Sequence, residues 1–326
     1  MQILLLIREF LQDIKKQKLR TFLTMAAITW GTLAVILLMA FGTGLGFRMR
    51  ESLLNAGDRI IRIWGGETSK KYQGLATGRG IRLVEEDAWY LQQAIPEIDM
   101  VHPTIDRGVQ LRKGESASYT HMEGVWPQFE LLRRTFSAPG GRFINEQDIK
   151  ERRRVVFLGG EIAKEICGRE NPVGEVITID GVPFTVIGTM PKKLQTSMNN
   201  GPDDRRALIP FTTFQTLYGY RYIGELMLHT RSPLDTQEVT RRAKEILGRK
   251  YQFDPKDERA LRIWDMVEAE KMSAKVFTGL NIFLGVIGAM TLVIAGVGVA
   301  NIMYVVAKER TKEIGIKRAV GAKRRH

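Results

Sequence analysis

The chain contains the charge-free stretch TFLTMAAITWGTLAVILLMAFGTGLGF from Thr21 to Phe47 and a second one, VFTGLNIFLGVIGAMTLVIAGVGVANIMYVVA, from Val276 to Ala307. These runs of 27 and 32 residues both exceed the roughly 20 apolar residues that a helix needs to cross about 30 Å of hydrocarbon. We therefore predict two transmembrane helices, over residues 21–47 and 276–307, with a long polar segment between them.

The basic residues beside these stretches predict how the chain is oriented. Five Lys and Arg residues precede the first stretch against two acidic ones, and eight follow the second against two. Short flanks rich in Lys and Arg stay in the cytoplasm. We therefore expect both termini in the cytoplasm and residues 48–275 outside the membrane as one large extracytoplasmic domain.

Overall charge and cysteine content argue against other classes of protein. The chain carries 49 Lys and Arg against 36 Asp and Glu. Much of the excess lies beside the membrane spans, where topology and attraction to anionic membrane lipids explain it, so we do not expect nucleic-acid binding. The first span is also longer than the roughly 7 to 15 apolar residues of a signal peptide. Cys167 is the only cysteine, so no intrachain disulfide can form.

Residues 1–20 carry the pattern of an amphipathic helix. Ile3, Ile7, Phe10 and Ile14 fall on one helical face, and basic residues lie elsewhere on the surface. Such a cytoplasmic helix either lies on the inner leaflet or packs on a partner protein, and the sequence leaves both alternatives open.

Small residues recur four apart within both predicted spans. This spacing places them on one face and lets another helix approach closely. The predicted helix-packing residues are Gly31, Gly42, Gly46, Gly285 and Gly296. Asn281 and Asn301 would face lipid in isolated spans, so we expect further helix partners.

Residues 48–275 show short strand-like runs that alternate with helical ones. Strands are predicted over residues 59–64, 107–112, 119–124, 155–158, 176–179, 184–187, 207–210 and 225–230. Helices are predicted over residues 83–95, 161–167, 212–217 and 235–247. Asp180-Gly181 indicates a β-hairpin, because both positions of its tight turn need positive φ. The sequence therefore predicts an α+β domain between two transmembrane helices.

The sequence contains no recognisable catalytic or cofactor site. Residues 65–70, GGETSK, have the composition of a phosphate-binding loop but not the spacing G-x-x-x-x-G-K-[ST]. The four histidines are far apart, with no H-E-x-x-H motif and no cysteine pair. Adjacent acids such as Glu85 and Glu86 point in different directions on regular structure. We therefore predict no catalytic residues, no cofactor and no metal site, and a chain that is not itself an enzyme.

The segment KERTKEIGIKRAVGA, residues 308–322, is the most distinctive part of the chain. It is charged and helix-prone, it starts where the second span ends, and Gly315 and Gly321 allow a close approach or a turn. A plain membrane anchor needs only Lys and Arg and gives no reason for this order. The segment resembles the ER…EIG…(K/R)A(I/V)GA stretch of the FtsX/MacB-type ABC transporter permease family.

Two further regions are similar to the same family. GRF at 141–143, VVFLG at 155–159, NPVGE at 171–175 and GVPFTVIG at 181–188 resemble motifs of the MacB-like periplasmic core domain. KLRTFLT at 18–24 looks like the basic lead into the family's first span. The matches occur in the family's order and run from about residue 5 to the last residue.

This resemblance implies a permease subunit of a mechanotransmission ABC transporter in the bacterial inner membrane. ATP hydrolysis on a separate ABC ATPase subunit would shift the long helices and rearrange the outer domain. The implied partners are that ATPase, a second permease copy or paralogue, and membrane lipids, and the resemblance leaves a periplasmic adaptor protein open. The outer domain would hold a sabre-like part over about residues 127–210 and a porter-like remainder. Within the coupling segment 308–326, the residues that would contact the ATPase are Glu309, Arg310, Glu313, Gly315, Lys317, Arg318 and Gly321.

The sequence departs from the family in its number of spans. Family permeases have four spans, whereas this sequence ends after two, which we interpret as a truncated chain.

The alternative to a permease is a two-span membrane sensor or receptor with an extracytoplasmic ligand-binding domain. Such a receptor would continue into long heptad-patterned helices or a kinase module and would co-purify with a signalling partner rather than an ATPase. The transported substrate is not identified by the sequence.

Overall fold

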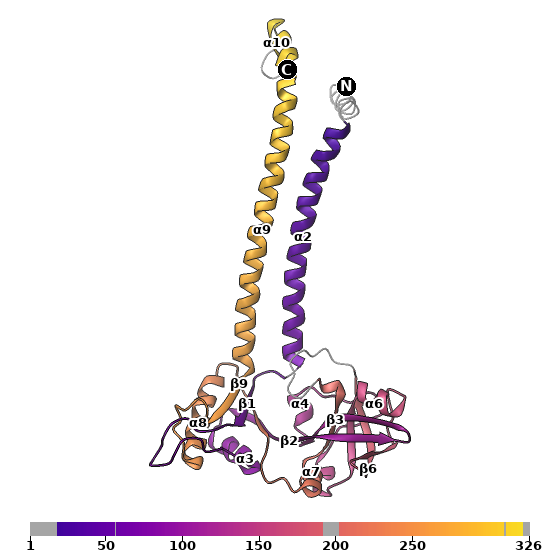
Figure 1. The fold of residues 1–326 in the computed structure, drawn as a ribbon, viewed down its shortest axis with the longest axis vertical. Coiled ribbons are helices and arrows are strands. Elements are labelled where there is room, and N and C mark those ends of the chain that lie inside the picture. The colour runs from indigo at the N-terminus through magenta and orange to yellow at the C-terminus, as the bar shows by residue number, and fades with distance from the viewer. Residues whose placement is uncertain (1–17, 56, 192–201, 310, 322–326) are drawn as a thin grey trace. The chain divides into compact units, whose positions relative to one another are not determined.

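The computed structural model describes residues 18–55, 57–191, 202–309 and 311–321 (Figure 1). It divides into two units, one made of residues 1–47 and 274–326 and the other of residues 48–273. The first unit contains most of the two long helices, and the second is an α+β domain. The amphipathic helix predicted over residues 1–20 lies almost entirely outside the described residues.

Two long helices, α2 (Lys18–Asn55) and α9 (Met266–Glu309), contain the predicted spans. By length and composition both are apolar enough to cross a membrane, over Ile28–Ser52 and Met266–Val305. Large apolar side chains along them are exposed, which suits a lipid environment and would be unfavourable in water. The expected α+β domain between two apolar helices is confirmed.

Four antiparallel strands form one half of the outer domain, in the order β2-β8-β1-β9. Its elements are β1 (Ile60–Gly65), α3 (Glu85–Ala94), β2 (Ile98–Lys113), β8 (Glu225–Thr230), α8 (Thr236–Tyr251) and β9 (Leu261–Asp265). This βαββαβ order is the ferredoxin-like arrangement, and Figure 1 shows α3 and α8 beside these strands. Ile61 and Ile63 of β1 are fully buried, as are Val239 and Leu247 of the amphipathic α8. Apolar burial between helices and sheet therefore holds this half together.

The second half is inserted between β2 and β8. Its elements are β3 (Ser116–Val125), α4 (Phe129–Leu132), α5 (Glu146–Lys150), β4 (Val155–Gly159), α6 (Gly160–Cys167), β5 (Val176–Ile179), β6 (Val182–Met190), the 3₁₀ turn η1 (Asp203–Arg205), β7 (Arg206–Pro210) and α7 (Phe211–Tyr218). Six strands close on themselves in the order β3-β7-β4-β6-β5-β2, because β2 also pairs with β3. The inserted half is thus a small closed barrel.

Strand β2 belongs to both halves. Its residues 98–104 pair with β8, and its residues 105–113 pair with β3. The sequence predicted only residues 107–112 of this strand, in part because Pro103 interrupts the pattern. The sabre-like part was predicted to start near residue 127, which is after β3. In the structure β3 pairs with β7 and so is itself a strand of the barrel. One strand shared by both halves leaves no flexible linker between them at this point.

The predicted hairpin at Asp180-Gly181 is confirmed. Both residues have positive φ, 47° and 83°, and they join β5 to β6 in an antiparallel pair. Other elements were missed by the sequence prediction. They are α4, α5, η1, β9 and the first half of β2.

Candidate functional site

Three buried ion pairs lie where the sheet meets the barrel. Arg62 of β1 pairs with Glu225 of β8, and the shortest contact of Arg206 on β7 is with Glu123 of β3. Arg133, at the end of α4, lies 2.8 Å from Asp203 of η1. The six side chains are between 3% and 9% exposed, so each charge depends on its partner rather than on water. We call these six residues the buried charge cluster.

His102 of β2 lies beside this cluster and is fully buried. Its ring packs on Phe129 at 4.9 Å between centroids, and within the described part of the chain neither ring nitrogen has a hydrogen-bond partner. Burial lowers the pKa of His102 to about 3, and the nearby Arg133 acts in the same direction. The ring is therefore neutral at physiological pH and serves as a packing group.

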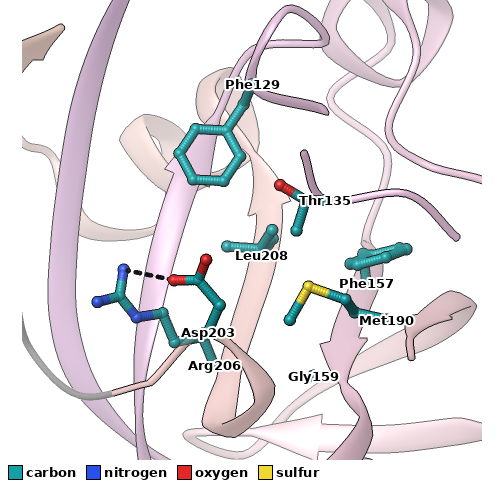
Figure 2. A pocket seen from close by; sticks show the side chains of 8 residues that line it. All are labelled: Phe129, Thr135, Phe157, Gly159, Met190, Asp203, Arg206 and Leu208. Carbon is teal, nitrogen blue, oxygen red and sulfur yellow. Dashed lines mark ion pairs between the residues drawn. The ribbon is translucent and has the colours of Figure 1, made fainter. Parts of the chain in front are cut away.

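A small cavity opens between the cluster and the barrel core. Figure 2 shows Phe129, Thr135 and Leu208 around it, with Asp203 and Arg206 3.8 Å apart at one side. Its volume is about 10 Å³, near the lower limit for a single water molecule. Pockets for small molecules measure several hundred cubic ångströms, so this cavity is no substrate site.

Two larger hollows lie at the surface of the described outer domain. One of about 510 Å³ lies beside the start of α6, between Pro139, Lys164 and Met190. Another of about 520 Å³ lies between α3 and α8, beside Tyr90 and Lys250. Among the described residues no group of three or more His, Cys, Asp or Glu side chains is arranged to hold a metal ion.

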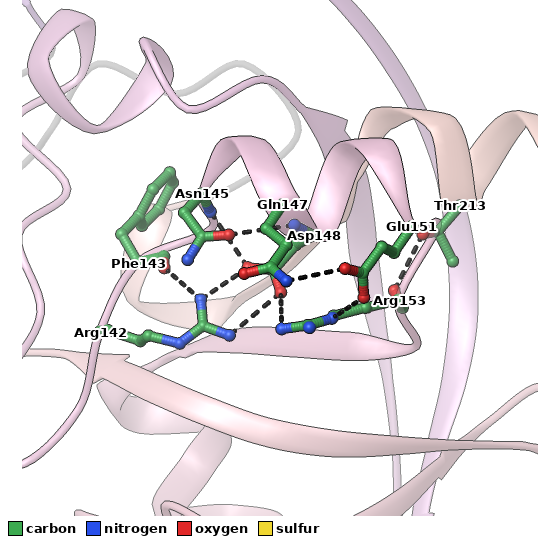
Figure 3. A network of polar contacts seen from close by, with 8 residues as sticks. All are labelled: Arg142, Phe143, Asn145, Gln147, Asp148, Glu151, Arg153 and Thr213. Atoms are coloured by element: carbon green, nitrogen blue, oxygen red, sulfur yellow. Dashed lines mark hydrogen bonds and ion pairs between the residues drawn. The ribbon is translucent and has the colours of Figure 1, made fainter.

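Arg142, from the GRF motif, anchors a polar network on the barrel (Figure 3). Its guanidinium contacts both carboxylate oxygens of Asp148, at 2.6 and 3.0 Å. Asp148 also accepts from the backbone N–H of Asn145, whose side chain caps the N–H of Asp148 in return, and Arg153 lies 3.6 Å away. Burial alone would raise the pKa of Asp148, but the hydrogen bonds from Arg142 and Asn145 outweigh it and lower the pKa. The network fixes the start of α5.

Two motif glycines allow backbone segments to touch. A Cβ at Gly188 would clash with the backbone carbonyl oxygen of Arg142 and would lie 2.8 Å from Ser137 Oγ. A Cβ at Gly159 would lie 2.6 Å from the carbonyl oxygen of Asp203. Side chains at these positions would push β4 and β6 off their neighbours. The outer-domain motifs thus serve packing rather than catalysis.

The described part of the coupling segment contains the helix α10 (Thr311–Ala319), and residue 310, between it and α9, lies outside the described residues. Gly321 has a φ of 97° and its N–H bonds to the carbonyl oxygen of Arg318, which ends the helix in a turn. Gly315 and Arg318 are exposed. Arg310 and the side chains of Glu309, Glu313 and Lys317 lie outside the described part. The described face of α10 is therefore open to a partner.

Family models match two parts of this chain. The MacB-like periplasmic core domain matches residues 21–246, and the FtsX-like permease C-terminal region matches residues 285–326. The first match covers more than half of the chain. The chain belongs to the MacB-like permease family.

Curated relatives agree with this assignment. The macrolide export ATP-binding/permease protein MacB of Bdellovibrio bacteriovorus is 30% identical over 319 residues, which cover 96% of this chain and 48% of that protein. The corresponding protein of Chlorobaculum tepidum is also 30% identical, over 96% of this chain and 48% of its own length. The MacB-like chain spans about half the length of the curated relatives it matches.

Solved structures share the fold of the outer domain. The periplasmic region of MacB from Actinobacillus actinomycetemcomitans aligns with a TM-score of 0.53 at 19% identity, over 68% of this chain and 95% of that one. The extracellular domain of the ABC-type transporter YknZ from Gram-positive bacteria aligns with a TM-score of 0.52 at 16% identity, over 63% of this chain and all of that one. A periplasmic core domain and two apolar helices indicate an inner-membrane protein.

In this MacB-like chain, α2 and α9 contact each other at small residues. A Cβ at Gly31 would lie 3.5 Å from Ala295 Cβ, one at Gly42 would lie 2.5 Å from Asn281 Oδ1, and one at Gly46 would lie 3.5 Å from Phe277. These pairs run in opposite directions along the two helices, so the contact is antiparallel. The α9 residues that meet α2 are Phe277, Asn281, Leu284, Gly288, Thr291 and Ala295. Their alternating spacing of four and three is that of a coiled-coil seam.

The other two predicted packing glycines lie away from this seam. A Cβ at Gly285 or at Gly296 would meet no heavy atom within 4 Å among the described residues, apart from the backbone of its own helix. Both stay predictions, for contact with a helix other than α2.

Several residues of interest in the MacB-like chain were not predicted from the sequence. Ile316 of α10 and Val320, which directly follows this helix, are 59% and 84% exposed, and the N–H of Val320 bonds to the carbonyl oxygen of Ile316. Their spacing of four is visible in the sequence and could have been used. The buried charge cluster was not visible, because its partners are 70 to 163 residues apart.

Proposed function

We propose that this chain is the permease part of an ABC transporter in which movements driven by ATP in the cytoplasm are transmitted to the outer domain. In this proposal both termini lie in the cytoplasm, and residues 308–326 dock on a separate nucleotide-binding subunit. The chain itself would carry no ATPase site. The observation that carries the proposal is the FtsX-like match over residues 285–326, which includes the open helix α10.

The surface of α10 supports docking on a protein. Ile316 and Val320 expose apolar side chains beside the basic Arg318, outside the charge-free span. A lone membrane anchor gains nothing from exposed apolar groups in the cytoplasm, whereas an interface core gains from covering them. The coupling residues would be Glu309, Arg310, Glu313, Gly315, Lys317, Arg318 and Gly321, with Ile316 and Val320 added.

The two long helices support transmission. At 1.5 Å per residue, the 38 residues of α2 and the 44 of α9 give lengths of about 57 and 66 Å. Both exceed the ~30 Å hydrocarbon core, so each helix would extend beyond the bilayer. Helix α9 also follows β9 with no intervening loop, and Asp265 Oδ1 accepts the N–H of Val267 at 2.8 Å, which caps the helix. A displacement of α9 would therefore reach the sheet directly.

The outer domain supports movement as one body. Strand β2 runs through both halves, and buried ion pairs hold strands together within each of them, β1 to β8 in the ferredoxin-like half and β7 to β3 in the barrel. The working unit would contain a second permease copy or paralogue. Contacts with a periplasmic adaptor protein and with membrane lipids belong to the same proposal.

Co-purification with the candidate ATPase tests the proposal. We would tag the full chain in membranes and compare wild type with Glu309→Ala plus Glu313→Ala and with Ile316→Ser plus Val320→Ser. Leu234→Ser is the matched control, because Leu234 is 82% exposed on the outer domain. We expect both coupling variants to lose the ATPase while membrane insertion and the control stay unchanged. If both coupling variants still bound the ATPase, residues 308–326 would serve only as a topology anchor, and the sensor hypothesis would be favoured.

A further inference from the structure

Six side chains, in two groups that meet along the consecutive residues 220–222, make up an aromatic and basic band on the outer domain, which we call the Arg-Tyr band. They are Arg82, Arg107, Tyr218, Tyr220, Arg221 and Tyr222. The guanidinium of Arg107 lies 4.2 Å from the ring centre of Tyr218, and that of Arg82 lies 5.3 Å from the ring of Tyr222. Phe214 packs against both Tyr218 and Tyr220. Each contact places a cation or a tilted ring against a neighbouring ring.

The backbone beneath the band is held in place. Gly219 ends α7 with a φ of 66°, and its N–H bonds to the carbonyl oxygen of Gln215. The N–H of Ile223 then bonds to Leu83, and that of Gly224 bonds to Thr104, at 3.0 and 2.9 Å. Short loops fixed in this way lose little conformational entropy when a partner binds.

The band is exposed and its arginines have no acidic partner. Tyr220 and Tyr222 are 40% and 43% exposed, and Arg82 and Arg221 are also on the surface. Among the described residues, no ion pair or hydrogen bond links the side chain of Arg82, Arg107 or Arg221 to a carboxylate.

Two acids near the band bond to other groups. Asp180 accepts the hydroxyl of Tyr218 at 3.2 Å and the N–H of Gln110 at 2.9 Å. Glu85 accepts from the side chain of Gln215, and burial raises its pKa. Neither acid forms an ion pair with an arginine of the band within the described residues, so the donors of the three guanidinium groups are available to an outside ligand.

We propose that the Arg-Tyr band is a docking surface for an acidic segment of a partner protein. Guanidinium groups bind carboxylates through two parallel hydrogen bonds, and stacking on tyrosine orients them before binding. Arginine and tyrosine are also enriched in the cores of protein interfaces, where lysine is depleted. The band contains no lysine and no apolar side chain that would insert into lipid, which favours a protein over a membrane surface.

The Arg-Tyr band includes residues from both halves of the outer domain. Arg107 lies in the barrel part of β2, opposite Met122 of β3, and Tyr218 ends α7. Tyr222 instead forms a bridge with Val84, just before α3 of the ferredoxin-like half. A partner that covers the band would contact both halves at once. The inference does not depend on ATPase coupling, because none of its residues belongs to α10.

Binding of a defined acidic peptide tests the proposal. We would measure the fluorescence anisotropy of a labelled peptide of alternating Glu and Tyr against the full chain in detergent, with a Lys-Tyr peptide of equal length as the probe control. We expect the Glu-Tyr peptide to bind and the Lys-Tyr peptide not to bind. The variant Arg82→Glu, Arg107→Glu, Arg221→Glu should weaken binding of the Glu-Tyr peptide at least tenfold.

A matched variant separates the band from overall charge. Arg112→Glu, Arg152→Glu, Arg262→Glu reverses three other exposed arginines for which no ion pair is found in the described residues. This variant should bind the peptide within twofold of wild type. Arg82→Glu with Arg221→Glu, which leaves Arg107 in place, serves if the triple band variant unfolds.

Two results would overturn the proposal. One is equal weakening by the band variant and the matched variant, which would make the binding a general effect of charge. The other is binding of anionic phosphatidylglycerol vesicles, lost in the band variant, without binding of the peptide, which would assign the band to lipid. Tyr220→Ser with Tyr222→Ser should weaken peptide binding severalfold. An unchanged affinity would show that these two tyrosines are not part of the docking surface.

Discussion

The motifs of the outer domain and those of the coupling segment lie in opposite environments. Gly159 and Gly188 face backbone or side-chain atoms within 3.0 Å of where a Cβ would stand, whereas a Cβ at Gly315 or Gly321 would meet no atom of the described residues within 4 Å, chain neighbours and the backbone of the same helix apart. Asp148 is fully buried in a network, whereas Arg318 is exposed. Motif residues in the outer domain therefore maintain the fold, and those of the coupling segment are available for contacts outside this chain.

Removing one member of the buried charge cluster should have the largest effect on stability. Arg206→Ala leaves the carboxylates of Glu123 and Asp203 buried without this partner, which should cost about 3–5 kcal/mol of unfolding free energy. Arg205→Ala is the matched control, because Arg205 is 44% exposed and pairs with Glu165 on the surface, where such pairs contribute about 1 kcal/mol or less. Urea unfolding of both variants measures the difference. Equal losses would mean that the cluster is no more important than a surface pair.

Acid should weaken the outer domain through His102. The unfolded state takes up a proton below pH 6.5, whereas in the folded state the pKa of His102 is about 3. Stability contributed by the neutral ring should therefore be lost as the pH falls from about 6.5 towards 3, at up to about 1.4 kcal/mol per pH unit. His102→Phe should remove this part of the slope, whatever it does to stability at neutral pH. An identical pH slope in the variant would place the acid sensitivity elsewhere.

Asp257 should give a smaller effect in a lower pH range. Burial raises its pKa, but hydrogen bonds from Ser69, Lys70 and the N–H of Arg259 outweigh burial and lower the pKa to about 2. The carboxylate should therefore stabilise the fold above pH 3.8, and this contribution should be lost as the pH falls towards 2. Asp257→Asn should cost about 1–2 kcal/mol at neutral pH. The wild-type and variant unfolding curves should converge near pH 2, and a gap that persists there would contradict the pKa argument.

The seam between α2 and α9 offers a test within the membrane unit. With Cys167→Ser as background, Val35→Cys and Gly288→Cys should form a disulfide, because a Cβ at Gly288 would lie 3.6 Å from Val35 Cβ. Adding Gly42→Leu should reduce the cross-linking yield severalfold, since a side chain there would meet Asn281 and Leu284. Gly285→Leu, on the open face of α9, should leave the yield unchanged. Equal yields with both leucines would show that the helices do not meet at Gly42.

The features that could be predicted from the sequence are those that depend on residues close together in the chain. The spans and the turn at Asp180-Gly181 are local signals, carried by missing charges and by residues that accept positive φ. The closed barrel was not predictable, because it depends on β3 pairing with β7 more than 80 residues later. Helix α5, five residues long, depends on a cap and the Arg142–Asp148 pair rather than on hydrophobic periodicity. Features set by neighbouring residues, such as spans and tight turns, can be predicted from one sequence, whereas strand pairing between distant residues cannot.

Substitutions in the coupling segment should have the smallest effect on stability. Arg318→Ala removes an exposed side chain that makes no ion pair within the described residues, so the unfolding free energy should change by less than about 0.5 kcal/mol. If Arg318 serves a partner, the same variant should nevertheless weaken association with the ATPase severalfold in a titration of the full chain. Lys312→Ala, six residues earlier on the exposed part of α10, tests whether the loss of any positive charge is enough to weaken association with the ATPase. A large loss of stability in Arg318→Ala would contradict the contrast between the two sets of motifs, because it would give the coupling segment a structural role within this chain.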